Sequence, residues 1–378
     1  MAGENGTLPG GRTIPSADRI LVKLRNMIDN QQYYEAHQLY RTLYFRYRNW
    51  GKFRELQELL FEGAILFLSK EQANSGADLS GLFLDALDKD PLVHELLSGA
   101  KDRNELYRRI GELFARIPAA SPERMTFAVS ALKLDASRFD VSLIHHNFAI
   151  VLFREKNFPE ARYHFLHSSP SSGAECAQML IEYQVSAASP YEVDLFIVQF
   201  ILQLLCLKTT AIRPAVPMHT CDTLTLSVGQ EEEQRSPQQA LATVTLRFYV
   251  ERHPRISCTS PPFRFPLINF AWLLLVVLPA GQSHVFKLLC DLYAVSLNRD
   301  PEYRKYLRRI GENYFGLPAA EQNRPQGLFG NLLQSLFAAD DASDDSDAGQ
   351  QTARPAAAAP TPVQISRPVR SHQDEDLD

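Results

Sequence analysis

Apolar residues recur every three to four positions over most of the chain, from about residue 17 to residue 316. This spacing places them on one side of an α-helix and predicts amphipathic helices. The clearest stripes span residues 20–28, 36–47, 56–68, 78–89 and 104–117, and the fourth of these predicts only a short helix. The pattern therefore predicts an almost entirely α-helical protein.

Three short motifs predict where helices begin. Ser-Pro-Glu at 121–123 and Asp-Pro-Glu at 300–302 combine a capping side chain with proline at the first helical position, where no backbone N–H is needed. Ser-Pro-Tyr-Glu at 189–192 places Glu three residues after Ser, which is the capping-box pattern. These motifs mark boundaries and carry no chemistry.

Two internal echoes indicate a repeated architecture. Arg-Arg-Ile-Gly-Glu occurs at 108–112 and again at 308–312, and an aromatic residue with Glu-Ala recurs at 33–36 and 158–161. Both separations are near multiples of the roughly 40 residues of helix-pair repeats. The sequence thus predicts an all-α fold, an α-solenoid of tetratricopeptide-like helix pairs, with a compact helical bundle as the alternative.

One stretch interrupts the helical pattern. Residues 209–237 contain prolines and a glycine, and the alternation at 223–228 predicts a short strand, so we expect a small β-hairpin or loop insertion in the C-terminal half. The expected organisation is a disordered N-terminus (1–16), two solenoid halves (17–188 and 189–317), an amphipathic segment (318–337) and an acidic disordered tail (338–378).

Charge is concentrated in the tail. The chain carries a net charge of −5, and residues 338–378 alone hold nine Asp or Glu against three Arg. The remaining body is close to neutral and has no basic stripe of the kind that neutralises nucleic-acid phosphates. We therefore expect no nucleic-acid partner.

The cysteines and the apolar segments of the sequence indicate in which cellular compartment the protein works. The five cysteines form no CxxC pair, which is typical of a reducing compartment, and residues 1–17 have no apolar signal-peptide core. The apolar run at 191–207 contains several polar side chains, and the run at 265–278 is short for a membrane span. The sequence predicts a cytosolic protein with no direct membrane insertion.

Catalytic and cofactor motifs are missing from the sequence. His145, His146, His164 and His167 are the clustered histidines, and no carboxylate or cysteine is placed to complete a metal site with them. There is no glycine-rich phosphate loop, nucleophile elbow or HExxH motif. We expect no cofactor, no metal and no enzymatic activity, and a chain that works by binding other proteins.

Arginines alternate with aromatic residues in the second predicted helix. Arg41, Arg46 and Arg48 lie among tyrosines such as Tyr44. One interpretation is a core stripe with arginines on its outer side. The other is a protein interface, since arginine and exposed aromatic residues are enriched at binding hot spots.

The sequence also resembles a known family. Residues 33–47 carry the pattern Tyr-Tyr-Glu-Ala-His-Gln-Leu-Tyr-Arg-Thr-Leu-Tyr-Phe-Arg-Tyr, and further matches follow in order at 121–124, 161–168, 192–194, 205–208, 261–263, 299–303 and 330–333. Together they resemble the Golgi-to-ER traffic protein 4 family, a subunit of the cytosolic complex that hands tail-anchored membrane proteins to their targeting ATPase. The matches span about residues 18–337.

The resemblance implies an adaptor rather than an enzyme, with a right-handed α-solenoid fold. Its N-terminal half would dock the targeting ATPase, and its C-terminal half a ubiquitin-like protein or a BAG-domain scaffold. The candidate partner-binding residues are Tyr34, Arg41, Tyr44, Arg46 and Arg48 for the ATPase, and Phe263, Trp272, Tyr303 and Tyr306 for the other partner. The alternative function is a tetratricopeptide-like structural subunit of a large cytosolic assembly, such as one of proteasome-lid type.

Overall fold

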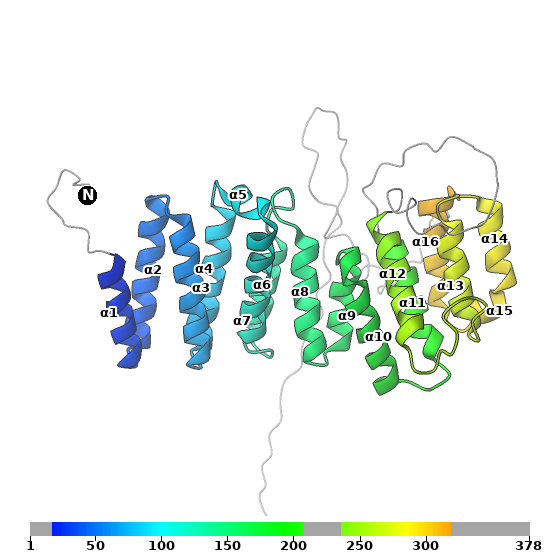
Figure 1. Ribbon diagram of the computed structural model, residues 1–378, viewed down its shortest axis with the longest axis horizontal. Helices are drawn as coiled ribbons and strands as arrows, with labels where there is room; N and C mark the ends of the chain where they lie inside the picture. Colours follow the sequence, from blue (N-terminus) through cyan, green and yellow to red (C-terminus); the bar gives the residue numbers. More distant parts are fainter. Residues whose placement is uncertain (1–16, 208–235, 319–378) are drawn as a thin grey trace, which may run out of the picture. The chain divides into compact units, whose positions relative to one another are not determined.

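The computed structural model describes residues 17–207 and 236–318, and its secondary structure there is helical, with no strand (Figure 1). The predicted all-α solenoid of helix pairs is confirmed. The predicted hairpin or loop at 209–237 lies outside the described residues, except for its last two positions, and so do residues 1–16, 319–337 and the acidic tail at 338–378.

The described helices belong to one compact unit. In the first half they are α1 (Ala17–Asp29), α2 (Tyr33–Asn49), α3 (Phe53–Ser69), α4 (Ala73–Asp88), α5 (Val93–Ser98), α6 (Ala100–Arg116), α7 (Pro122–Leu132), α8 (Val141–Arg154), α9 (Phe158–Leu166), the 3-10 turn η1 (Pro170–Ser172) and α10 (Gly173–Ala187). The second half holds α11 (Val193–Cys206), α12 (Pro237–Arg252), α13 (Pro266–Val277), α14 (Ser283–Leu292), α15 (Ala294–Leu297) and α16 (Glu302–Phe315).

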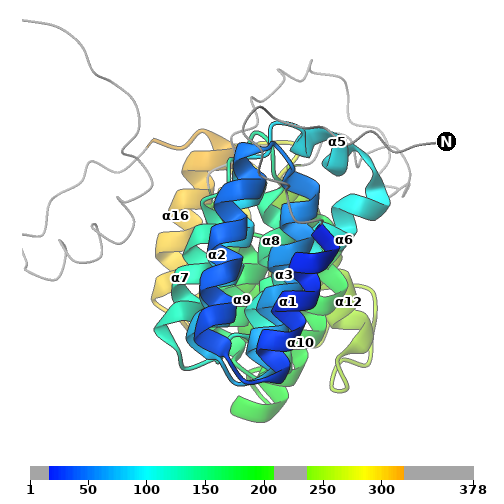
Figure 2. The same ribbon diagram turned by 90° about the vertical axis from the view of Figure 1, so that its left-hand side faces the viewer.

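Consecutive helices pack into two layers. Helix α6 contacts α3 and α8 in one layer, and α4 contacts α2 and α7 in the other. The same order continues where α10 packs on α12 and α9 on α11. Figure 2 shows the two layers end on. The last helices form a closing group, because α13 and α16 both pack on α11, and α14 packs on both.

One turn geometry recurs between paired helices. Gln31, Gly51 and Glu71 have φ of 59°, 69° and 59° and lie twenty residues apart, and Lys156 repeats the geometry with φ of 62°. In each turn the following residue donates its N–H to a carbonyl five residues back, for example Lys52 to Tyr47 at 3.0 Å. This is the Schellman end of a helix. The twenty-residue step gives the helix-pair repeat of about 40 residues its physical basis.

The sequence echoes reflect repeated packing. The two Arg-Arg-Ile-Gly-Glu motifs lie in α6 and α16, where Ile110 and Ile310 are fully buried. A Cβ added to Gly111 would lie 2.9 Å from the Asn147 Cβ, and one added to Gly311 would lie 2.8 Å from a Leu317 methyl. Each glycine thus allows a close approach to its neighbour. In both helices the motif therefore places a buried isoleucine and a closely packed glycine side by side in the core.

Helix starts agree with two of the three predicted motifs. Ser121 Oγ accepts a hydrogen bond from the Arg124 N–H at 3.3 Å at the start of α7, and the Asp300 carboxylate accepts one from the Glu302 N–H at 2.9 Å. The capping box predicted at 189–192 is half formed: the Ser189 N–H donates to the Glu192 carboxylate at 2.9 Å, but the Ser189 hydroxyl accepts from the Tyr191 N–H and α11 begins only at Val193. A complete capping box is formed at α12, between Ser236 and Gln239.

Candidate protein-binding surfaces

Helix α2 has both a buried tyrosine stripe and exposed arginine and aromatic side chains. Tyr40, Tyr44 and Tyr47 are buried, so these tyrosines form the core stripe. Exposed aromatic side chains lie elsewhere on the helix and its end: Tyr34 is 73% exposed, Phe45 54% and Trp50 46%. The arginines are exposed as well: Arg41, Arg46 and Arg48.

Part of this exposed set shares one face. Tyr34, Arg41, Phe45 and Arg48 are separated by seven, four and three residues, which are spacings that return to one side of an α-helix. We call these four residues the α2 stripe. Arg46 lies about a third of a turn from the stripe, so the structure separates it from the other two predicted arginines.

Acidic residues of α4 lie beside the α2 stripe. The Asp78 carboxylate lies 3.5 Å from Arg41 Nη1. It also forms a hydrogen bond with His37 Nε2 at 2.8 Å. Asp85 accepts a hydrogen bond from the buried Tyr44 hydroxyl, and Lys89 lies 2.5 Å from its carboxylate. The surface is therefore a patchwork of both charges with two exposed rings. Such surface pairs contribute little stability and can be exchanged for a partner's charges.

Asp85 is held in its charged form. Burial acts to raise the pKa of this carboxyl, but hydrogen bonds from Lys89 and Tyr44 outweigh it, and the pKa lies below its usual value. The pKa of Tyr44 is raised, first by burial and then by its bond to Asp85. Tyr44 thus supports the surface from behind by keeping an ionised carboxylate in place, rather than touching a partner itself.

The predicted C-terminal residues divide into core and surface. Phe263 and Tyr303 are 5% and 1% exposed, and both belong to the core rather than to a binding surface. The Tyr303 hydroxyl donates to the Leu195 carbonyl at 3.4 Å, and the Phe263 ring packs edge-on against Trp272 at 5.7 Å. Trp272 and Tyr306 are partly exposed. The burial arises because α13 and α16 both close over α11.

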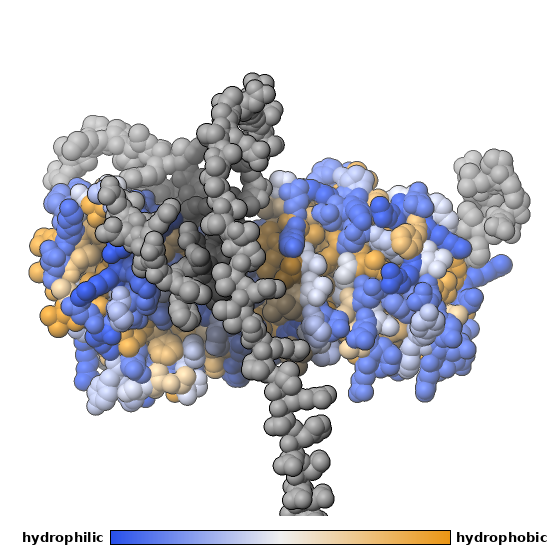
Figure 3. Space-filling view, turned by 180° about the vertical axis from the view of Figure 1, so that it is seen from behind, coloured by the Kyte–Doolittle hydropathy of each residue, from blue (hydrophilic) through white to orange (hydrophobic). Residues whose placement is uncertain are grey.

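The exposed apolar surface of this half lies on other residues. Leu288 is 58% exposed, Leu292 71% and Val295 87%, and they form what we call the α14–α15 apolar face. Figure 3 shows apolar side chains at this end of the row. The sequence analysis missed them, although Leu288 and Leu292 lie one turn apart, about a third of a turn around the helix from the buried Phe286 and Leu289. A second apolar stripe on one helix is a signal of a binding surface.

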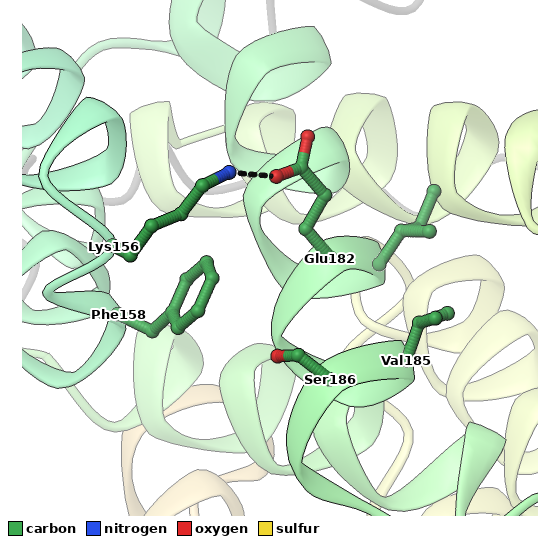
Figure 4. A pocket seen from close by; sticks show the side chains of 6 residues that line it. Lys156, Phe158, Glu182, Val185 and Ser186 are labelled. Atoms are coloured by element: carbon green, nitrogen blue, oxygen red, sulfur yellow. Dashed lines mark hydrogen bonds and ion pairs between the residues drawn. The ribbon is translucent and has the colours of Figure 1, made fainter.

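A hollow of about 500 Å³ lies between the α8–α9 turn and α10 (Figure 4). Phe158, Ile181 and Val185 line it, and Lys156 and Glu182 form an ion pair of 2.6 Å across one side. The two charges satisfy each other, and the Ser186 hydroxyl, which also lines the hollow, donates to the Tyr183 carbonyl at 3.1 Å. The hollow can accept an apolar side chain and offers no catalytic arrangement.

The predicted histidine cluster is a packing feature. His145 and His164 lie Nδ1 to Nδ1 at 2.9 Å in the core between α8 and α9. Burial, and then the neighbouring histidines, lower the pKa of His145 to about 3 and that of His164 to about 4. Across residues 17–207 and 236–318, no three His, Cys, Asp or Glu side chains are grouped to hold a metal ion.

Among the described helices, none combines the length and the hydropathy needed to cross a bilayer. The apolar helices α11 and α13 have 14 and 12 residues. Their apolar side chains are used in packing, since α11 contacts α12, α13 and α16.

Comparison with known proteins identifies the family. The family model described as Golgi to ER traffic protein 4 matches residues 51–337. The chain belongs to this family. Golgi to ER traffic protein 4 homolog B of Xenopus laevis is 40% identical over 358 residues, which cover 94% of this chain and 98% of that protein. The Homo sapiens homolog is 38% identical over 347 residues, covering 91% and 94%. The family resemblance found in the sequence is thereby confirmed.

A solved structure shares the fold of this Golgi to ER traffic protein 4 family member. The crystal structure of C. therm. Get4 superposes with a TM-score of 0.63 at 20% identity, and covers 87% of this chain and 99% of that one. At this identity the match speaks for the architecture alone. The two-layer helical arrangement is therefore common to both chains.

Proposed function

We propose that this protein is a cytosolic adaptor in the delivery of tail-anchored membrane proteins to the endoplasmic reticulum. It acts by binding rather than by catalysis, and it couples a targeting ATPase to a ubiquitin-like or BAG-domain co-chaperone. The observation that carries the proposal is the presence of two chemically different exposed surfaces near the two ends of the helix row, on α2 and on α14–α15. Membership of the Golgi to ER traffic protein 4 family supports the pathway.

The α2 stripe is the surface proposed for the ATPase. Arg41 and Arg48 flank Phe45, a ring that is 54% exposed, and this is the composition of interface hot spots. Asp78 lies 3.5 Å from Arg41 and would exchange partners when an acidic group of the ATPase docks. Charge pairing of this kind gives orientation and fast association.

The α14–α15 apolar face is the surface proposed for the co-chaperone. Leu288, Leu292 and Val295 offer apolar area with few charges, which suits a stable interface with a buried centre. Trp272 and Tyr306 lie in the same closing group of helices and remain partly exposed.

Two variants test the division of labour. The first is Arg41→Glu with Arg48→Glu, and the second is Leu288→Asp with Leu292→Asp. We expect the first to weaken ATPase binding by about 2 kcal/mol, because like charges then face each other, and to leave the co-chaperone bound. The second should do the reverse. Binding of each purified partner to the full chain is measured by calorimetry at low and moderate salt, because the ATPase effect should shrink with salt.

Arg46→Glu is the matched control, since it changes the same charge off the stripe. Circular dichroism checks that each variant keeps its helix content. The proposal fails if both double variants bind both partners as the native chain does. It also fails if the native chain is found only as a fixed subunit of a larger assembly and binds no ATPase.

A further inference from the structure

Arg162 on α9 is an exception to how this chain treats sequestered arginines. Arg124 is 4% exposed and its guanidinium donates to both oxygens of Glu155 at 2.8 and 3.0 Å. Arg299 is itself exposed, but it donates in the same way to both oxygens of the buried Asp194, at 3.0 and 2.8 Å. Such pairing is the rule for sequestered charges, because an isolated one is costly to take out of water.

No carboxylate of the described residues pairs with Arg162. Its Nη2 is enclosed and has no hydrogen-bond partner. The guanidinium lies over the Phe200 ring at 5.9 Å, and its other electrostatic neighbours are Cys176 and the tyrosines of α10 and α16. Burial lowers the pKa of Arg162, and these neighbours offset it only in part.

A second donor without an acceptor faces the same region. Phe200, which lies under the Arg162 guanidinium, and Gln203 are one turn apart on α11, and the Tyr306 hydroxyl oxygen accepts a hydrogen bond from Gln203 Nε2 at 2.8 Å. The Tyr306 hydroxyl proton has no acceptor among the described residues. Both Arg162 and Tyr306 are partly exposed, so a ligand can approach them at their exposed atoms, although Nη2 of Arg162 is itself enclosed.

The rim of this region is also cationic. Arg309, three residues after Tyr306, is exposed, and its pairing with Glu312 is long, at 3.5 Å. The exposed Arg308 precedes it, and no described residue pairs with it. An enclosed guanidinium, a free phenolic donor and cationic side chains at the edge all require the same complement, which is an anion.

We propose that the region between α9, α11 and α16 centred on Arg162 is a docking site for an acidic segment of a partner protein, with one carboxylate seated between Arg162 and Tyr306. The carboxylate accepts from the guanidinium and from the phenol, and further acidic residues of the segment lie along Arg308 and Arg309. This site is separate from the α2 stripe and from the α14–α15 apolar face.

The geometry also explains why an unpaired charge is kept there. In the free chain Arg162 lowers stability, because its largely buried guanidinium lacks the carboxylate partner that the buried Arg124 has in Glu155. When the acidic segment binds, the same guanidinium forms a charge-assisted contact in a region of low dielectric, where such contacts are strong. Binding of the acidic segment therefore offsets the folding free energy that the unpaired Arg162 guanidinium costs in the free chain.

The test uses the full chain and a fluorescein-labelled peptide with a run of Glu and Asp, followed by fluorescence anisotropy. A peptide with Gln and Asn at the same positions and inorganic phosphate are the comparison probes. We expect the acidic peptide to bind, and Arg162→Gln to weaken it about 30-fold, the effect of removing one partner of an enclosed charge pair. Tyr306→Phe should weaken it about threefold, because only a hydroxyl is lost.

Arg154→Gln on the preceding helix is the matched control, since it removes one exposed charge and should leave peptide affinity unchanged. Thermal unfolding separates binding from structure. We expect the melting temperature of Arg162→Gln to equal or exceed that of the native chain. The proposal is overturned if Arg162→Gln lowers the melting temperature by several degrees or binds the acidic peptide as the native chain does. It is also overturned if the neutral peptide or phosphate binds equally well.

Discussion

Single side chains in this protein are tuned by burial more than by contact with charges. His145, His164 and His253 are all buried, and each has a lowered pKa whose main cause is burial. Each is kept neutral by neighbours that suit a neutral ring, such as Gln184 at 3.2 Å from His253 Nε2. The buried tyrosines behave in the same way, and burial raises the pKa of Tyr40 to about 12. At this scale the molecule keeps its buried histidines and tyrosines neutral, whereas buried charges such as Arg124 and Asp194 are paired with an opposite charge.

We expect the buried His145 and His164 to lower the free energy of unfolding in mild acid. In the unfolded chain they protonate near pH 6.5, whereas His145 and His164 remain neutral in the fold down to about pH 3 and 4. The unfolded state therefore binds more protons as pH falls, and stability present above pH 6.5 declines below it. We expect a decline of up to about 1.4 kcal/mol per pH unit for each such histidine.

Urea unfolding between pH 7.5 and pH 4.5 measures this slope. His164→Asn keeps a hydrogen-bonding group near His145 and removes one titrating ring, so the slope should become shallower. His94→Asn, at an exposed position, is the matched control and should keep the slope of the native chain. Equal slopes for the native chain and His164→Asn would contradict the assignment.

Several helices in this protein are joined by a turn that requires a residue with positive φ, although most of the residues found there are not glycine. The positive-φ position is glycine at Gly51 but Gln, Glu and Lys at the three equivalent positions. Sequence reasoning looks for glycine at such helix ends, and the other three turns therefore carried no visible signal. They are tolerated because the residues lie in solvent and the surrounding hydrogen bonds define the turn. The start of α4 was also predicted too far along the chain, at residue 78 instead of Ala73. Its first turn is mostly polar, so it has no apolar stripe that would predict a helix.

A pair of glycine substitutions separates turn from helix. Gly51→Ala should lower the free energy of unfolding by about 1 kcal/mol, because φ is 69° there and no atom crowds the new methyl group. Gly81→Ala, in the middle of α4 and also uncrowded, should raise it by up to about 1 kcal/mol. Glu71→Gly should stabilise slightly, as it relieves the same backbone cost.

Denaturant unfolding with a common slope for all variants is the measurement. The turn hypothesis would be abandoned if Gly51→Ala were as stable as the native chain while Gly81→Ala showed its expected gain.

At the scale of the whole described unit, contacts between distant parts of the chain join the closing helices to the solenoid. Asp194 on α11 is 1% exposed and pairs with Arg299, which lies 105 residues further on. Burial raises the pKa of Asp194, and the Arg299 contact opposes that rise. Tyr303 adds a bond to the Leu195 carbonyl, and Gln203 adds one to Tyr306. Together these contacts hold the segment that carries the α14–α15 apolar face.

Removing Arg299 should loosen this attachment. Arg299→Met leaves the Asp194 carboxylate buried without its partner, and we expect a loss of about 2 kcal/mol, less than for a fully enclosed pair because Arg299 is partly exposed. Adding Asp194→Asn should restore part of the loss, since the buried charge is then gone. Thermal unfolding of the two single variants and the double variant forms the cycle. Strictly additive losses would show that the pair does not couple the two elements.

The sequence alone determined the helical class, the repeat, most core stripes and the family, because each depends on periodicity or motifs local to the chain. Periodicity shows which side of a helix is most apolar, and it correctly placed Tyr40 and Tyr47 in the core. It cannot show whether a second helix covers the other side. Tertiary structure alone decided that Tyr303 is enclosed and Leu292 exposed, and that Asp78 lies beside Arg41, because these depend on which helices meet.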